Sequence, residues 1–131
     1  MNIVNIKLKR CQNWKTLIIC CRSTLGENIA DNGGLKAAYR ACFPNHTRTT
    51  PPQQPVPGLR LTAEQLFFVS YAQVWCGANT AEYEVNKLLT NPHPPSSTRV
   101  TATLSNSEEF SRAFQCPPGA VMNPDKKCSL W

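Results

Sequence analysis

Apolar residues recur at helical spacing in four stretches of the chain, and cap residues precede three of them. The first stretch predicts a helix over residues 25–41, with Thr24 and Glu27 at the spacing of a capping box. The pair Gly33-Gly34 lies inside this helix, where each glycine costs about 1 kcal/mol relative to alanine. We therefore expect the pair to mark close packing against another element, or a kink.

The second stretch predicts a helix over residues 63–75, which the cap residue Thr62 precedes. Its apolar residues cover most of its circumference, which is typical of a helix that is buried on nearly all sides. Residues 81–89 predict a third, shorter helix. Between the first two helices, residues 43–59 contain five prolines and are expected to form a loop.

The last third of the chain alternates between predicted elements and irregular segments. Along residues 99–104, polar and apolar side chains alternate well enough to predict a short strand or an extended segment. Ser105 or Ser107 then caps a fourth helix that runs to residue 114. Residues 116–131 hold three prolines and two cysteines and should be irregular, fixed by disulfides. The expected fold class is mainly α with long irregular loops, in one small domain.

Charge and hydropathy argue against two classes of protein, nucleic-acid binders and membrane-spanning proteins. The net charge is +6, but the basic residues are scattered and do not alternate with aromatic residues as a nucleic-acid stacking surface requires. We expect a solvated basic surface and no nucleic-acid partner. The longest apolar run, 17–21, is far shorter than the roughly 20 residues of a membrane span, so no span is expected. Residues 1–21 form no convincing targeting signal.

Seven cysteines in 131 residues favour an oxidising compartment. Because the number is odd, at least one thiol is unpaired or pairs outside the chain. Asn45 begins an Asn-His-Thr sequence in a loop rich in proline and threonine, and is a candidate N-glycosylation site. Both observations point to a protein outside the cytosol.

Two acidic residues are the first candidates for chemistry. Glu27 and Asp31 are spaced i and i+4, so both carboxylates lie on one face of the predicted helix. Spacing alone favours a solvated acidic turn near a helix N-terminus, where the helix dipole favours negative charge. The alternative is a metal-ligand carboxylate whose neighbour, one turn away, orients a histidine ligand.

This pair lies in the first of several unusual motifs that occur in a fixed order. They are TLGENIADNGGL at 24–35, QLFF at 65–68, YAQVWC at 71–76, NPHP at 91–94, TLSNS at 103–107 and MNPDKKCSLW at 122–131. Together with Arg99-Val100 and Phe110, they resemble the C-terminal part of zinc metallopeptidases of the neprilysin and endothelin-converting-enzyme family. The resemblance covers residues 24–131. It implies the C-terminal portion of a gluzincin-type catalytic domain, with residues 1–23 a non-family stretch that is disordered or artefactual.

The resemblance also implies a metal site. Glu27 matches the third ligand of a catalytic Zn²⁺, and Asp31 matches the acid that hydrogen-bonds a zinc-binding histidine on another helix. In the family, the other two ligands and the general base come from a His-Glu-x-x-His helix. This sequence has only His46 and His93 and contains no such motif. A catalytic zinc needs three protein ligands, so we expect the isolated chain neither to bind zinc tightly nor to hydrolyse peptides.

Other residues match substrate-contacting positions of the family. His93 matches a histidine that donates to the oxyanion of the tetrahedral intermediate, although a lone histidine between prolines is by default a surface residue. Arg99 matches an arginine that binds a substrate carbonyl, and by itself is most often a solvated or salt-bridged arginine. Val74 and Trp75 match walls of the pocket for the side chain after the scissile bond; from periodicity alone, both are core residues.

The family match also assigns cysteines. Cys76, Cys116 and Cys128 match positions whose disulfide partners lie N-terminal to the matching region, and Cys42 is additional.

Two functions remain open. The leading hypothesis is a portion of a zinc metalloendopeptidase that hydrolyses small peptides, secreted or at the extracellular face of the plasma membrane. The alternative is a non-catalytic truncated module that binds peptides or associates with a full-length family member.

Overall fold

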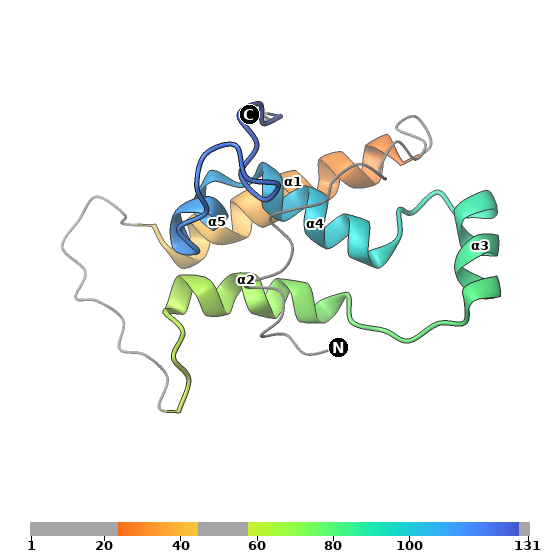
Figure 1. The fold of residues 1–131 in the computed structure, drawn as a ribbon, viewed down its shortest axis with the longest axis horizontal. Helices are drawn as coiled ribbons and strands as arrows, with labels where there is room; N and C mark the ends of the chain where they lie inside the picture. Colours follow the sequence, from red (N-terminus) through yellow and green to blue (C-terminus); the bar gives the residue numbers. More distant parts are fainter. Residues whose placement is uncertain (1–23, 45–57, 129–131) are drawn as a thin grey trace.

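The computed structural model describes residues 24–44 and 58–128, which form five helices (Figure 1). They are α1 (Leu25–Cys42), α2 (Ala63–Val74), α3 (Ala81–Thr90), α4 (Ser96–Asn106) and α5 (Glu108–Ala113). Within these residues there is no strand, and only an isolated bridge joins Ala120 to Asn123. The expected fold class, mainly α with irregular loops, is confirmed. None of the described helices is both long and apolar enough to cross a membrane.

Helix α1 follows the predicted bounds closely, but its first turn differs from the prediction. Thr24 occupies the cap position, yet its side chain makes no capping hydrogen bond. Its Oγ1 instead accepts a hydrogen bond from Asn28 Nδ2 at 3.3 Å. The predicted capping box is therefore wrong, because the Glu27 carboxylate is held by a partner on another helix. At Gly34, an added Cβ would meet no atom of another described element within 4 Å, so the expected close packing is not found there among the described residues.

Helix α2 has the cap that the sequence predicts. Thr62 Oγ1 accepts from the Gln65 backbone N–H, and Gln65 Oε1 accepts from the Thr62 backbone N–H, so the capping box is complete. Gln65 Nε2 also donates to the Ala113 carbonyl at 2.8 Å, which ties α2 to the end of α5. The expected burial on nearly all sides is not found within the described residues. Phe68 is 1% exposed, whereas Val74 is 76% exposed.

Residues 99–104 are helical, so the predicted strand or extended segment is wrong. They belong to α4, where Val100 packs against the core and Thr103 and Leu104 are buried. These three positions are spaced i, i+3 and i+4 and lie on one helix face. Burial of that face outweighs the preference of β-branched residues for extended backbone. The next helix, α5, begins as predicted after Ser107, whose hydroxyl accepts from the Phe110 N–H.

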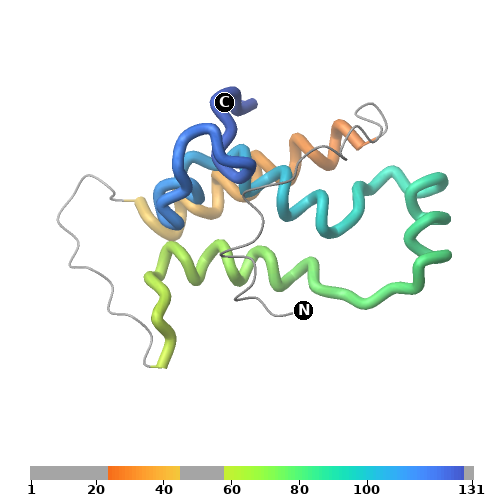
Figure 2. The backbone as a smooth tube through the Cα atoms, in the orientation of Figure 1, coloured from red at the N-terminus to blue at the C-terminus, as the bar shows by residue number. Residues whose placement is uncertain are grey.

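An aromatic core holds α1, α2, α4 and α5 together. The buried apolar residues come from all four helices and from the irregular C-terminal segment; they are Leu35, Tyr39, Phe68, Leu104, Phe110 and Met122. The Phe68 ring stacks on Tyr39 with 5.6 Å between centroids and meets Phe110 edge-on at 5.5 Å. Helix α3 contributes no buried residue and stands apart at one end of the molecule (Figure 2).

Tyr39 carries a polar contact at the edge of this core. Its hydroxyl donates to Glu64 Oε1 at 2.8 Å and accepts from Arg112 Nη2 at 3.4 Å, so it joins α1, α2 and α5. Burial, followed by the hydrogen bond to Glu64, raises the pKa of Tyr39 to about 12. The neutral phenol is therefore the form that the folded state stabilises.

We expect this contact to make stability depend on pH in alkali. Because the folded-state pKa of Tyr39 lies above its usual 10.0, the stabilisation is complete below pH 10 and is lost as the pH rises toward 12. The loss should be about 2–3 kcal/mol in the free energy of unfolding, measured by urea titration at several pH values. Tyr39→Phe should remove this share of the pH dependence, and Tyr83→Phe, at an exposed position, should retain it. Equal slopes in both variants would contradict the assignment.

Candidate functional site

Residues from four parts of the chain meet where α1 begins. Glu27 and Asp31 lie in the first turns of α1, Trp75 ends α2, His93 lies between α3 and α4, and Arg99 lies near the start of α4. These are five of the six residues for which the sequence predicted a metal, catalytic or substrate-contacting role. The fold brings them together although they are up to 72 positions apart in sequence.

The Arg99 guanidinium is the centre of this group. Its Nε and Nη2 donate to the two carboxylate oxygens of Asp31, each at 2.6 Å, in a bidentate pair. The pair is largely shielded from solvent, with 11% of the Arg99 side chain and 8% of the Asp31 side chain exposed. Hydrogen bonding to Asp31, supported by the charges of Asp31 and Glu27, raises the pKa of Arg99 above its already high usual value.

Glu27 is the second carboxylate on the same guanidinium. Arg99 Nη2 donates to Glu27 Oε2 at 2.9 Å, while Glu27 Oε1 faces His93. The Glu27 side chain is 35% exposed, so it is accessible from solvent. Among the described residues, the carboxylates of Glu27 and Asp31 share the one guanidinium of Arg99.

The Trp75 ring forms the floor beneath the guanidinium. The Arg99 Cζ atom lies 4.0 Å from the centroid of the ring, which is the distance of a cation–π contact. Tyr71, one turn earlier on α2, meets the same ring edge-on at 6.5 Å. The Trp75 indole N–H is buried and has no hydrogen-bond partner among the described residues. The contact with Arg99 thus fixes the end of α2 against α1 and α4.

His93 is the most exposed member of the group. Its Nε2 lies 3.4 Å from Glu27 Oε1, and 48% of its side chain is exposed. On the other side of the ring, Nδ1 lies 2.8 Å from Asn91 Oδ1. From the sequence, no role was expected for Asn91. The available signal was its position two residues before a candidate histidine, where an asparagine side chain can bond to the backbone.

The remaining predicted site residues do not join this group. Val74 is adjacent to Trp75, but neighbouring residues on a helix point about 100° apart, and Val74 is 76% exposed. Cys76 and Cys128 are exposed free thiols, as is Cys42, and Cys116 is half-buried. No disulfide joins two described residues, so the disulfides expected to fix the C-terminal segment are not found there. Asn45 lies outside the described residues.

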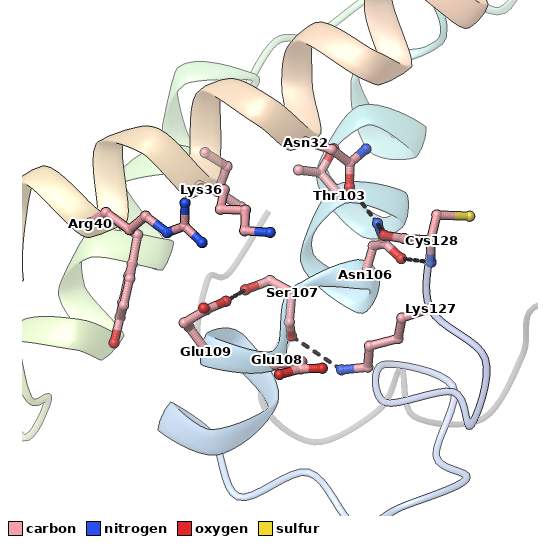
Figure 3. Close-up of a pocket in the computed structure, with 12 residues that line it drawn as sticks. Asn32, Lys36, Arg40, Thr103, Asn106, Ser107, Glu108, Glu109, Lys127 and Cys128 are labelled. Atoms are coloured by element: carbon pink, nitrogen blue, oxygen red, sulfur yellow. Dashed lines mark hydrogen bonds between the residues drawn. The ribbon is translucent and has the colours of Figure 1, made fainter. Parts of the chain in front are cut away.

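A separate cavity of about 350 Å³ lies between α1, the junction of α4 and α5, and the C-terminal segment (Figure 3). Beside this cavity, hydrogen bonds hold the C-terminal segment against the helices. Lys127 Nζ donates to Ser111 Oγ at 2.8 Å, and Asn106 exchanges hydrogen bonds with the backbone of Cys128. Burial lowers the pKa of Lys127. The residues that line this cavity do not include any of the group around Arg99.

The described residues do not complete a catalytic zinc site. A catalytic zinc takes three protein ligands and an open position. Within residues 24–44 and 58–128, no group of three histidine, cysteine, aspartate or glutamate side chains can hold a metal ion. Glu27 can provide one carboxylate oxygen that Arg99 does not engage. No zinc-dependent step follows from these residues alone.

Comparisons with known proteins agree on one family. The sequence model of peptidase family M13 matches residues 9–130. Mouse endothelin-converting enzyme 1 is 56% identical over 110 residues, and human neprilysin is 51% identical over 109 residues. These alignments cover 84% and 83% of this chain but only 14% of each relative. A solved structure, the Haemonchus galactose containing glycoprotein complex, matches 83% of this chain and 19% of its own, with a TM-score of 0.68 and 38% identity.

We expect the Arg99–Asp31 pair to dominate the stability of this end of the molecule. Arg99→Gln leaves the Asp31 carboxylate buried without a counter-charge, and the free energy of unfolding should fall by about 3–5 kcal/mol. The double variant Asp31→Asn/Arg99→Gln should recover part of that loss, because neither charge remains. Arg60→Gln, at an exposed position, should change it by less than about 0.5 kcal/mol. Urea unfolding measures all three; equal stability of the Arg99 and Arg60 variants would contradict the expectation.

Proposed function

The chain belongs to peptidase family M13, and we propose that it supplies one side of the active site of a zinc metalloendopeptidase that hydrolyses small peptides. The observation that carries this proposal is the convergence of Glu27, Asp31 and Arg99 from two helices onto one partly buried ion-pair network. Because the chain spans only 14% of the curated relatives that it matches, the activity of the whole protein is part of the proposal. By family, we also propose a secreted protein or one at the extracellular face of the plasma membrane.

Glu27 is the proposed zinc ligand. Its Oε1 is not engaged by Arg99, and its side chain is partly exposed. Two histidine ligands and the general base would come from a His-Glu-x-x-His helix that is not in this sequence. A zinc ion at such a site supplies Lewis-acid chemistry and lowers the pKa of a bound water. Asp31, one turn from Glu27, would hydrogen-bond one of the histidine ligands and so orient it.

Arg99 is the proposed contact to the substrate backbone. Its Nε and Nη2 groups are committed to Asp31 and Glu27, and within the described residues its Nη1 group makes no hydrogen bond. A guanidinium fixed on one side by a bidentate pair can donate from the other side to a carbonyl with little loss of entropy. Asp31 therefore has a second proposed task, which is to hold Arg99 in the orientation that leaves Nη1 available.

His93 and Trp75 complete the proposed substrate side. His93 lies at the exposed edge of the group and can contact an oxygen that develops negative charge during peptide hydrolysis. Trp75 gives an apolar surface beneath Arg99, and we propose that it borders the pocket for the substrate side chain after the scissile bond. Val74, whose side chain is exposed beside it, would extend that surface.

A chimera tests these roles. Residues 24–131 should replace the matching C-terminal segment of mouse endothelin-converting enzyme 1, to which the chain is 56% identical. We expect the purified chimera to hold zinc and to hydrolyse a fluorogenic peptide. Glu27→Gln should lose both the metal and at least about 100-fold in kcat/KM, because a ligand is lost. Arg99→Lys should mainly raise KM, since its loss removes a contact to the bound peptide.

The matched control in the chimera is Glu82→Gln, which changes an exposed carboxylate on α3. It should keep full zinc content and activity. A folded chimera whose Glu27→Gln variant retains zinc would overturn the ligand assignment. For the isolated chain, metal analysis should find less than stoichiometric zinc and peptide assays no turnover; tight zinc with turnover would contradict the expected incompleteness.

A second proposal, association with another part of a family member, rests on the exposed face of α3. Val85, Leu88 and Leu89 are 57%, 40% and 81% exposed and, with Ala81, occupy positions i, i+4, i+7 and i+8 of the helix. Such a stripe is an amphipathic face that has no partner within the described residues. We propose that the upstream part of an M13 peptidase covers it, because the matched relatives contain about six times as much sequence outside this segment.

Co-expression of the chain with the part of human neprilysin that precedes the matched segment tests this association. We expect the two to co-purify, and Val85→Asp/Leu89→Asp to reduce recovery of the complex at least tenfold, because two charges would be buried on binding. The control Asn86→Asp adds a charge to the polar face of the same helix and should bind normally. Equal recovery with all three chains would exclude α3 as the docking surface.

A further inference from the structure

We propose that Tyr71 is a positioning residue, whose aromatic ring holds the Trp75 indole in place beneath the Arg99 guanidinium. The orientation of the indole follows from contacts within the chain. Only its purpose, which is to shape the wall beside the bound peptide, rests on the proposed function. Tyr71 therefore acts on the substrate through Trp75 and makes no contact of its own in this role.

Trp75 lies where α2 stops, so the helix supports its ring from one side only. Its backbone N–H still bonds to the Ala72 carbonyl at 3.3 Å, whereas residues 76–80 are not helical. A helical side chain leans over the turn that precedes it, and Tyr71 lies in that turn, four positions earlier on the same face. The two rings meet edge-on, with 6.5 Å between centroids and 69° between planes. Aromatic pairs prefer this arrangement.

Hydrogen bonds among the described residues do not orient the indole. The Trp75 indole N–H is buried and has no partner there, so contacts of the ring itself set its orientation. One such contact is with the Arg99 guanidinium, whose Cζ lies 4.0 Å from the ring centroid. A cation is attracted to the whole face of a ring, whereas the edge of a second ring sterically restricts rotation. The contact with Tyr71 is therefore the one that limits how the indole turns.

The ring of Tyr71 carries this role, and its hydroxyl does not. The hydroxyl oxygen is buried and makes no hydrogen bond within residues 24–44 and 58–128. The ring packs against the aromatic core, one turn after the fully buried Phe68 on the same helix. Thus the core fixes Tyr71, and Tyr71 in turn fixes Trp75. A buried hydroxyl without a partner contributes no stability, so Tyr71→Phe should preserve the arrangement.

Fluorescence of Trp75 tests the inference in the full chain. The sequence has three tryptophans, so Trp14→Phe/Trp131→Phe leaves Trp75 as the sole tryptophan. Time-resolved anisotropy, excited where tyrosine does not absorb, reports the sub-nanosecond motion of the indole. We expect a small amplitude of this motion in the otherwise native chain and in Tyr71→Phe. Tyr71→Leu, which removes the ring edge, should raise the amplitude about twofold or more.

Tyr83→Leu, which removes an exposed ring from α3, is the matched control and should leave the anisotropy unchanged. An indole that is already mobile in the otherwise native chain overturns the inference, and this measurement needs no change at position 71. Tyr71→Phe that mobilises Trp75 as much as Tyr71→Leu also overturns it, because the ring would then not be the part that acts. So does an immobile indole in a Tyr71→Leu chain whose far-UV circular dichroism is native.

The chimera with mouse endothelin-converting enzyme 1 measures the consequence for the substrate. Two fluorogenic peptides differ only in the residue after the scissile bond, which is phenylalanine or alanine. Tyr71→Leu should change the ratio of their kcat/KM values at least about fivefold, mainly through KM, and Tyr71→Phe should retain the ratio. An active Tyr71→Leu chimera with an unchanged ratio would overturn the role in shaping the wall. Because the anisotropy involves neither zinc nor peptide, an inactive chimera with an immobile Trp75 would support the positioning role and count against the proposed function alone.

Discussion

The buried pair of Arg99 and Asp31 is the interaction on which the arrangement of the site depends. A guanidinium and a carboxylate that are both nearly inaccessible to water are costly to separate, because either charge left alone loses several kcal/mol of solvation. The pair joins the start of α4 to the first turns of α1. The same guanidinium lies on Trp75 at the end of α2, so one side chain holds three helices.

Helix α1 connects this ion pair to the aromatic core. Its first turns carry Glu27 and Asp31, and its last turns carry Tyr39, which stacks on Phe68 in the aromatic core. Tyr39 lies eight positions after Asp31 in the helix, a distance of about 12 Å along its axis. The core therefore fixes the direction in which the two carboxylates point. Functional groups on a helix anchored in this way are held more closely than groups on a loop.

The same end of the molecule is incomplete in two physical respects. Around Glu27, two carboxylates share one guanidinium among the described residues. On α3, which stands beyond the ends of α2 and α4 in Figure 1, apolar side chains are exposed on one helix face. Both features are typical of a surface that further polypeptide covers, and both agree with relatives of which the matched segment is a small part.

Interactions between residues close in sequence were sufficient to predict most of the helices. The stretches around α1, α2, α3 and α5 have helical periodicity, and the caps Thr62 and Ser107 form as predicted. These features depend on residues three or four positions apart, so the sequence by itself determines them. The family resemblance also identified five of the residues that meet at the site, although spacing alone favoured ordinary surface or core roles for each of them.

Tertiary contacts decided the rest, because they act between residues that are distant in the chain. Residues 99–104 become helical since Val100, Thr103 and Leu104 can be buried only on one helix face. Glu27, which was expected to cap its own helix, instead bonds to Arg99, 72 positions away. The sequence by itself determined that Glu27 and Asp31 place two carboxylates on one helix face. Only the fold supplied the guanidinium that holds them, because no local pattern specifies a partner on another helix.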